Sequence, residues 1–263
     1  WKNAATFRKG TPADLVIGQA DFNASGCNRG ANAPSDKTLC FPDGVAVGPD
    51  GDLYVADRDN HRVLRFASPF SSGFTADQPA AAVFGQADFV SGICNRNPML
   101  KPASADTLCA PSGVAVDANG SVFIADGLAP GFHNNRVLEY DDPKAAGGGT
   151  PGTPGSAGDR TADAVIGQAN FTSVACNRSS ATPAANTLCG PSGLFVNATG
   201  SGVLFVADTQ NNRVLQLFME TAPSIREAVL LDALGAAQAR YDRVLVDLPA
   251  SGHAVTMLNT PAM

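Results

Sequence analysis

Short runs of apolar residues alternate along the chain with clusters of Gly, Pro, Asp and Asn. The runs are rich in Val, Ile, Leu and Phe, which is typical of short antiparallel strands joined by turns. In the first copy of the pattern the runs fall at residues 44–47, 53–57 and 62–66, and a fourth run opens the next copy. Pro49-Asp-Gly51, between the first two runs, is typical hairpin sequence. The pattern therefore predicts units of four antiparallel strands.

The whole unit occurs three times, within residues 15–66, 83–140 and 165–217. Each copy begins with an apolar run that ends in Gly-Gln and continues through Cys-Asn-Arg to Thr-Leu-Cys-x-Pro-x-Gly. It then reaches a run that ends in Ala-Asp, and closes on Asn-Arg-Val-Leu or Asn-His-Arg-Val-Leu. Four-stranded sheets repeated around an axis form a β-propeller. We therefore expect an all-β domain of three four-stranded blades over residues 1–218.

The recurring residues resemble the NHL repeat, a family of propeller blades. The resemblance rests on Pro-x-Gly-Val-Ala-Val, Gly-x-Leu-Tyr-Val-Ala-Asp and Asn-x-Arg-Val, and it covers residues 13–218. Two long insertions depart from a compact blade, namely the loop that carries the cysteines and the Gly- and Pro-rich segment 145–158. The resemblance implies a propeller whose ligands bind at one mouth of its central channel.

The strand count predicts a partner for this domain. The chain supplies three sets of three strands and three fourth strands, one of which precedes the first set. Propellers close with about four to eight blades, so three blades leave an open edge. We expect a homodimer in which the N-terminal strand of each protomer completes the third blade of its partner, giving six blades. The alternative is that the sequence is a piece of a longer propeller.

Six cysteines form one pair in each copy. Their separations of 13, 15 and 13 residues match neither a zinc site nor a Cys-x-x-Cys redox motif. Local disulfides are predicted, each contributing roughly 3 kcal/mol, and they place the protein in an extracytoplasmic compartment, periplasmic or secreted. Buried free thiols are the alternative. The predicted pairs are Cys27 with Cys40, Cys94 with Cys109, and Cys176 with Cys189.

The composition changes after residue 218. Residues 224–240 have the spacing of an amphipathic helix and residues 243–248 that of a strand. The segment from 241 onward resembles part of the arsenite-transporting and tail-anchored-protein-targeting ATPases, so 219–263 is treated as a separate tail. The chain has no Gly-x-x-x-x-Gly-Lys phosphate loop, so ATP hydrolysis is not expected. Asp247 and His253 are then interpreted as relics of that family.

Charge and hydropathy narrow the class of partner. The formal net charge is −6 and the sequence pI is about 4.9, which does not favour nucleic acid. No run of apolar residues approaches the roughly 18 that a membrane span requires. A small molecule or another protein is the expected ligand.

Equivalent arginines in the three cysteine loops are the first candidate ligand site. The loops should gather at one channel mouth, where Arg29, Arg96 and Arg178 would face a carboxylate or phosphate. His133, in the irregular loop of the second copy, is added to this set. The alternative is that each Asn-Arg pair braces its own loop by bonding to carbonyl oxygens.

A second recurring set pairs an acid at the end of one strand with an arginine at the start of the next. A residue needed in every blade is expected to brace the blade and not to act as a unique catalyst. The three pairs are Asp57 with Arg62, Asp126 with Arg136, and Asp208 with Arg213.

These features favour a binding or scaffold module with its ligand at the propeller mouth. The alternative is a hydrolase of esters, lactones or phosphotriesters, and whether the chain is catalytic stays open. Some six-bladed propellers of this kind use calcium or zinc, so a divalent metal is the cofactor to consider, although no metal motif is evident. Asp43, Asp117 and Asn197, near the first strand of each blade, could contribute ligands in a symmetric dimer.

Overall fold

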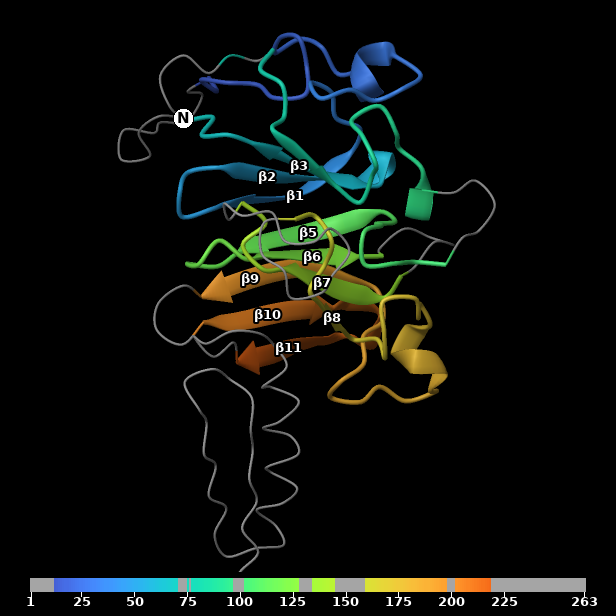
Figure 1. Ribbon diagram of the computed structural model, residues 1–263. Helices are drawn as coiled ribbons and strands as arrows, with labels where there is room; N and C mark the ends of the chain where they lie inside the picture. The colour runs from blue at the N-terminus through green and yellow to red at the C-terminus, as the bar shows by residue number, and fades with distance from the viewer. Residues whose placement is uncertain are drawn as a thin grey trace, which may run out of the picture.

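The computed structural model describes residues 12–70, 75, 77–96, 102–127, 134–144, 159–197 and 202–218. Within these ranges the chain forms three antiparallel sheets stacked in sequence order (Figure 1). We call the sheets blades 1, 2 and 3. Blade 1 contains β1 (Pro42–Val47), β2 (Leu53–Asp57), β3 (Arg62–Phe66) and β4 (Ala82–Phe84); blade 2 contains β5 (Pro111–Val116), β6 (Val122–Asp126), β7 (Arg136–Tyr140) and β8 (Ala164–Ile166); blade 3 contains β9 (Pro191–Asn197), β10 (Val203–Asp208) and β11 (Arg213–Phe218).

The predicted order of four antiparallel strands is confirmed in blades 1 and 2. In blades 1 and 2 each strand pairs with its neighbour in the sequence, and the fourth strand comes from the head of the following copy. Blade 3 has three strands among the described residues, and β11 is its outer edge. The propeller-type, all-β fold predicted from the repeats is thus present.

The N-terminal copy of the fourth strand is described but is not paired as a strand. Residues 15–17 precede Gly18, which has φ +91°, and the equivalent Gly85 and Gly167 have φ +84° and +90° after β4 and β8. A Cβ on any of these glycines would lie 2.6 Å from the leucine that precedes the second cysteine of the copy. The N-terminal segment therefore has the local structure that follows a fourth strand, without a neighbouring strand.

The hydrophobic core lies between the blades. One cluster joins blades 1 and 2 through Tyr54, Phe84 and Tyr140, and a second joins blades 2 and 3 through Phe123 and Leu204. Alternate residues of each strand point to opposite faces, so the middle blade is buried on both. We call these two contacts the internal seams. The outward face of blade 3 is exposed. On the outward face of blade 1 only β1 is exposed, because a third cluster that contains Val55, Leu64 and Phe66 is buried under Ile17, Leu39 and Phe89.

All three predicted disulfides are present, Cys27–Cys40, Cys94–Cys109 and Cys176–Cys189. The first cysteine of each lies in a short 3-10 turn, and these turns lie on the same side of the stack (Figure 1). Three disulfides indicate an oxidising, extracytoplasmic environment. No described helix has the length and apolar character to cross a membrane. The turns are η2 (Cys27–Gly30), η4 (Cys94–Arg96) and η5 (Cys176–Ser179), and the β2–β3 and β10–β11 connections contain η3 (Arg58–Asn60) and η6 (Thr209–Asn211).

The predicted tail, residues 219–263, lies outside the described residues. Its helix, its strand, Asp247, His253 and the resemblance to the ATPases stay predictions.

Candidate functional site

A buried ion pair braces each blade. In blade 1, Arg62 Nε donates to Asp57 Oδ2 at 2.7 Å, and both side chains are fully buried. The other guanidinium nitrogens donate to the carbonyl oxygens of Ser35, Thr38 and Phe89. Asp126 with Arg136 and Asp208 with Arg213 repeat the pair at 2.9 and 2.7 Å. The structure therefore gives these residues the bracing contacts that the repeat suggested.

The aspartate of each pair also holds the loop that carries the disulfide. Its Oδ1 accepts the backbone N–H of the second cysteine at 2.6 to 2.7 Å in all three blades. Its Oδ2 also accepts from the amide of Asn60, Asn134 or Asn211 at 2.8 Å. That amide in turn bonds the asparagine of the Cys-Asn-Arg motif, as Asn60 does with Asn28. The cysteine loop and the turn between the second and third strands thus form one rigid rim.

The three loop arginines lie along this rim and bond mainly to their own loops. Arg29 donates to the carbonyl oxygens of Gly18, Gln19 and Lys37, and it pairs with Asp77 at 2.8 Å. Arg96 contacts the Gly85 carbonyl and Asp106, and Arg178 contacts the Gln168 carbonyl. These contacts support the bracing alternative. A ligand role for the arginines stays a prediction, and His133 lies outside the described residues.

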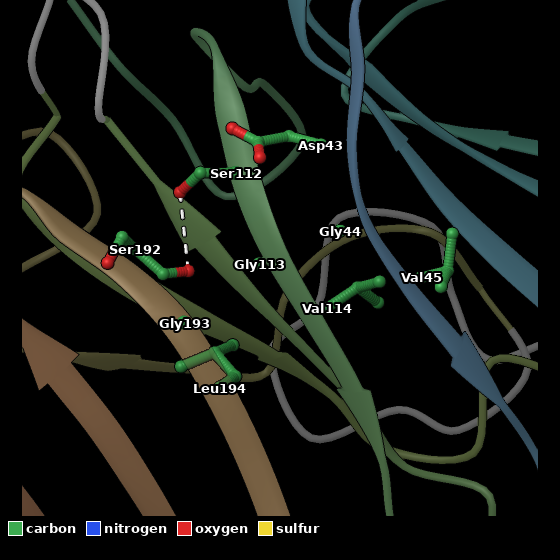
Figure 2. Close-up of a pocket in the computed structure, with 9 residues that line it drawn as sticks. All are labelled: Asp43, Gly44, Val45, Ser112, Gly113, Val114, Ser192, Gly193 and Leu194. Atoms are coloured by element: carbon green, nitrogen blue, oxygen red, sulfur yellow. Dashed lines mark hydrogen bonds between the residues drawn. The ribbon is translucent and has the colours of Figure 1, made fainter.

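A hollow of about 310 Å³ opens where the first strands of the three blades begin (Figure 2). These strand ends directly follow the second cysteine of each pair, so the hollow lies at the channel mouth on the cysteine-loop side. Each start has the sequence Pro-x-Gly, and a register shift occurs there in all three sheets. Such a bulge re-aims the side chain it carries. The lining consists of Asp43, Gly44, Val45, Ser112, Gly113, Val114, Ser192, Gly193 and Leu194.

Asp43 is the one charged side chain in this lining. Its carboxylate lies 3.6 Å from Arg58 Nη1. Arg58 also bonds Asp59 at 2.9 Å and stacks on the ring of Phe41, 5.5 Å from the ring centroid. Blades 2 and 3 have Ser112 and Ser192 in place of Asp43, and the Ser112 hydroxyl donates to the Pro191 and Ser192 carbonyls. Blade 1 therefore supplies the charge of the mouth, and the other blades supply hydroxyl groups.

From the sequence, Asp43 was expected near the first strands together with Asp117 and Asn197. The structure does not bring these three together, because Asp43 lies at the start of β1 whereas Asp117 follows the end of β5 and Asn197 ends β9. Asp117 instead accepts backbone N–H groups from its own turn. No group of three metal-ligating side chains occurs in the part of the chain that the structure describes. Ser112 and Ser192 were missed, although the variable residue of Pro-x-Gly marks all three positions.

His61 is a structural residue of the first internal seam. Its Nδ1 accepts the backbone N–H of Ala110 at 3.0 Å. Asn135 occupies the equivalent position in blade 2, and its Oδ1 accepts the N–H of Gly190 at 2.7 Å. Burial lowers the pKa of His61, against the opposing charges of Asp59 and Asp126. The neutral imidazole is the form that can accept this bond.

The NHL repeat family model matches residues 39–66 and 108–140, which are the corresponding parts of blades 1 and 2. Peptidyl-alpha-hydroxyglycine alpha-amidating lyase 1 of Drosophila melanogaster is 31% identical over 100 residues. That match covers 38% of this chain and 15% of the relative.

Two solved structures are also similar, with low TM-scores. Regucalcin of Agrobacterium tumefaciens, described as a calcium-binding protein, matches 70% of this chain and 48% of its own, with 14% identity and a TM-score of 0.35. A streptogramin B lyase matches 72% of this chain and 53% of its own, with 14% identity and a TM-score of 0.28. The chain thus spans about half the length of these two proteins, and neither assigns a role to any residue here.

Proposed function

We propose that this chain is an extracytoplasmic propeller module that binds a ligand at the channel mouth, in the hollow between the starts of β1, β5 and β9. The observation that carries the proposal is the hollow itself, which is lined by one carboxylate and two serines on a disulfide-braced rim. A concave site with a few convergent polar groups is the usual form of a ligand site. The rigid rim would hold these groups in place without the ligand.

The charge of the hollow favours ligands that donate hydrogen bonds. A carboxylate accepts bonds and attracts cations. The Ser112 hydroxyl, whose hydrogen is donated to backbone carbonyls, can also only accept from a ligand, and the Ser192 hydroxyl bonds Thr209 Oγ1 at 2.6 Å. Asp43 keeps more than a third of its side chain exposed, so it is open to a ligand. The other acid and arginine pairs described above are used within the blades. Amines and polyols therefore fit this mouth better than phosphates or carboxylates.

Ligand-induced thermal stabilisation tests the proposal. A panel of small amines and sugars is added to the full chain, and the midpoint of unfolding is followed by fluorescence. A compound that binds should raise the midpoint. Asp43→Asn should remove the shift, while Asp59→Asn, which also alters a partner of Arg58 but lies outside the lining, should keep it. A shift that survives Asp43→Asn would place the ligand elsewhere.

The likeness to an amidating lyase over 100 residues favours an enzyme as the second candidate. As an enzyme, the chain would be a hydrolase, with calcium or zinc as its metal. Metal analysis of the purified chain and turnover of activated esters with and without EDTA test this second candidate. Turnover that EDTA abolishes would establish the enzyme. A chain with neither metal nor turnover would leave binding as the function.

A further inference from the structure

The two internal seams bring backbones very close at a repeated glycine. A Cβ added to Gly44 would lie 2.5 Å from the Ser112 carbonyl oxygen, and one added to Gly113 would lie 2.1 Å from that of Ser192. A Cβ added to the third glycine of the series, Gly193, would make only an ordinary contact, with Ala207 Cβ at 3.7 Å. Blade 3 thus has the same inner strand without the neighbour that requires the glycine.

A polar cap crosses each internal seam in the same way. His61 of blade 1 accepts the N–H of Ala110 in blade 2, and Asn135 of blade 2 accepts that of Gly190 in blade 3. The residue that follows in this series is Asn212, with the same left-handed φ of about +53°. Asn212 is exposed, whereas the equivalent Asn135 is buried. The backbone N–H of Phe41 corresponds to that of Ala110, and it is the donor from which the Asn212 side chain would accept.

The bracing arginines also reach across the seams. Arg62 donates to the Phe89 carbonyl oxygen, and Arg136 donates to that of Phe171, where each acceptor follows the fourth strand of the blade. Arg213 makes the bonds within its blade but has no such acceptor among the described residues. Its side chain is 25% exposed, compared with 0% for the other two. The missing acceptor corresponds to Phe22, at the other end of the domain.

A repeated glutamine in the later blade of each seam lacks its partner in blade 1. Gln86 Nε2 donates to the His61 carbonyl and to Ile93 within its own loop, and Gln168 repeats both bonds with Asn135 and Ala175. Gln19 makes only the bond within its loop, to the Gly26 carbonyl at 2.9 Å. The carbonyl oxygen of Asn212 is the acceptor that completes the series. Blade 1 thus carries the residues that the later blade contributes to a seam, and blade 3 carries those that the earlier blade contributes.

The N-terminal segment already lies where a preceding blade would place its fourth strand. Ile17 packs against the blade 1 cluster that contains Phe66, as Phe84 of β4 packs against Tyr140 of blade 2 with ring centroids 5.2 Å apart. Ile17 therefore covers part of the outward face of blade 1 and leaves β1 exposed, and this exposed part is what we call the open face of blade 1. The open edge of blade 3 is β11, the strand equivalent to those that pair with β4 and β8.

The exposed parts of the two outward faces are apolar at positions that are buried inside the chain. On blade 1 this exposed part is β1, since Val55 and Leu64 behind it are already buried. Val45 is 65% exposed, whereas the equivalent Val114 is 4% exposed. Val214, on the open face of blade 3, is 66% exposed, whereas Val137 is fully buried. Phe195 and Phe218 extend the blade 3 face. Burying both faces would remove a large apolar area from water.

We propose that the open face of blade 1 binds the open face of blade 3 in a second copy of this chain, so that two copies close one six-bladed ring with two-fold symmetry. The N-terminal strand of each copy then pairs with β11 of the other. A second copy is the occupant that these contacts support, because the two faces are the two halves of the seam already repeated twice within the chain. The ring would also bring the start of a second β1 next to Gly193, which lines the hollow at the channel mouth.

The mass of the full chain in solution tests this proposal. Light scattering after size exclusion should give about 54 kDa, twice the 26.9 kDa of one chain. Gly193→Val should give a folded monomer, because a Cβ at this position makes only an ordinary contact within its own blade, whereas the side chain would block the close approach of a second copy. Gly113→Val is the matched control at an internal seam and should not fold, because its Cβ meets the Ser192 carbonyl oxygen.

Three results would overturn the proposal. A monomeric wild-type chain would mean that other blades or no partner cover the faces. An assembly of any other mass would exclude the two-fold ring. A dimer that persists in Gly193→Val, with a wild-type circular dichroism spectrum, would place the contact between copies elsewhere. None of these outcomes depends on the ligand at the mouth, so the binding proposal is tested separately.

Discussion

The internal seams and the two outer faces are built from the same repeated residues but differ in burial. Leu138 and Val137 of blade 2 face the neighbouring blades on opposite sides and are fully buried. Val214 repeats Val137 in blade 3 and is exposed because no described blade follows it. A repeat therefore encodes half of each interface, and its neighbour decides whether that half becomes core. This is the nearest-neighbour logic of proteins made from stacked repeats.

The largest expected difference concerns the bracing arginines. Arg136→Ala leaves Asp126 buried without its cation, which should lower the free energy of unfolding by about 3–5 kcal/mol. Arg213→Ala removes a partly exposed partner and should lower it by about 1–3 kcal/mol in dilute protein. Urea unfolding measures both.

The two arginine variants also report on assembly. The loss caused by Arg213→Ala should grow with protein concentration, because the proposed ring buries this residue. Equal losses for the two variants at every concentration would show that the seam and the open edge do not differ in energy.

The apolar seam gives the next largest effect. Val137→Ala removes buried methyl groups and leaves a cavity between blades 2 and 3, so it should lower the free energy of unfolding by roughly 2 kcal/mol. Val214→Ala, at the equivalent exposed position, should change it by less than about 0.5 kcal/mol in dilute protein. Both changes are measured by urea unfolding at one low concentration. A similar loss at both positions would mean that the outer face is already covered in the monomer.

Most of the fold could be predicted from the sequence because the signals are local and occur three times. The Pro-x-Gly starts, the strand runs ending in Ala-Asp and the cysteine spacing each specify one strand or loop, and the structure places them as expected. The spacing of Cys27 and Cys40 also identified a local pair correctly. The strand count alone predicted that the N-terminal copy of the fourth strand has no partner within the chain.

The site was harder to predict because it depends on contacts between copies. The sequence left open whether the guanidinium of Arg29 faces a ligand or braces its own loop, because the carbonyl oxygens that it contacts are set by the folding of that loop. The grouping of Asp43 with Asp117 failed because the two acids lie at opposite ends of the first strands. A single serine in the sequence does not indicate a binding site, and Ser112 and Ser192 come together only when the blades stack.

Glu139 and Gln216 occupy equivalent positions at an internal seam and at the open face. Burial and the nearby Asp141, Asp163 and Asp117 raise the pKa of Glu139 to about 8, from 4.5. Between these values the folded chain keeps a proton that the unfolded chain has released, so stability falls as the pH rises. We expect a loss of about 1–2 kcal/mol between pH 5 and pH 9, less than the full pKa shift implies because the side chain stays partly exposed.

Two substitutions check the role of Glu139. Glu139→Gln should flatten the pH dependence and stabilise the chain at pH 9. Gln216→Glu, on the exposed face, should add no pH dependence in dilute protein. An unchanged profile in Glu139→Gln would assign the effect to other carboxylates.

The smallest expected effect separates the two caps of the internal seams. His61 and Asn135 cap equivalent amides, but only the histidine can be protonated. Burial lowers the pKa of His61, so below about pH 6.5 the unfolded chain binds a proton that the folded chain excludes. The free energy of unfolding therefore decreases as the pH falls. His61→Asn should leave stability at pH 8 within about 0.5 kcal/mol, since asparagine accepts the same bond and tolerates the left-handed φ of +52°. Urea unfolding from pH 8 to pH 5 should then show a smaller acid-side loss than in the wild type, while His61→Ala, which has no acceptor, should be less stable at both ends. If His61→Asn kept the full acid-side loss, the cap of the first seam would not be its source.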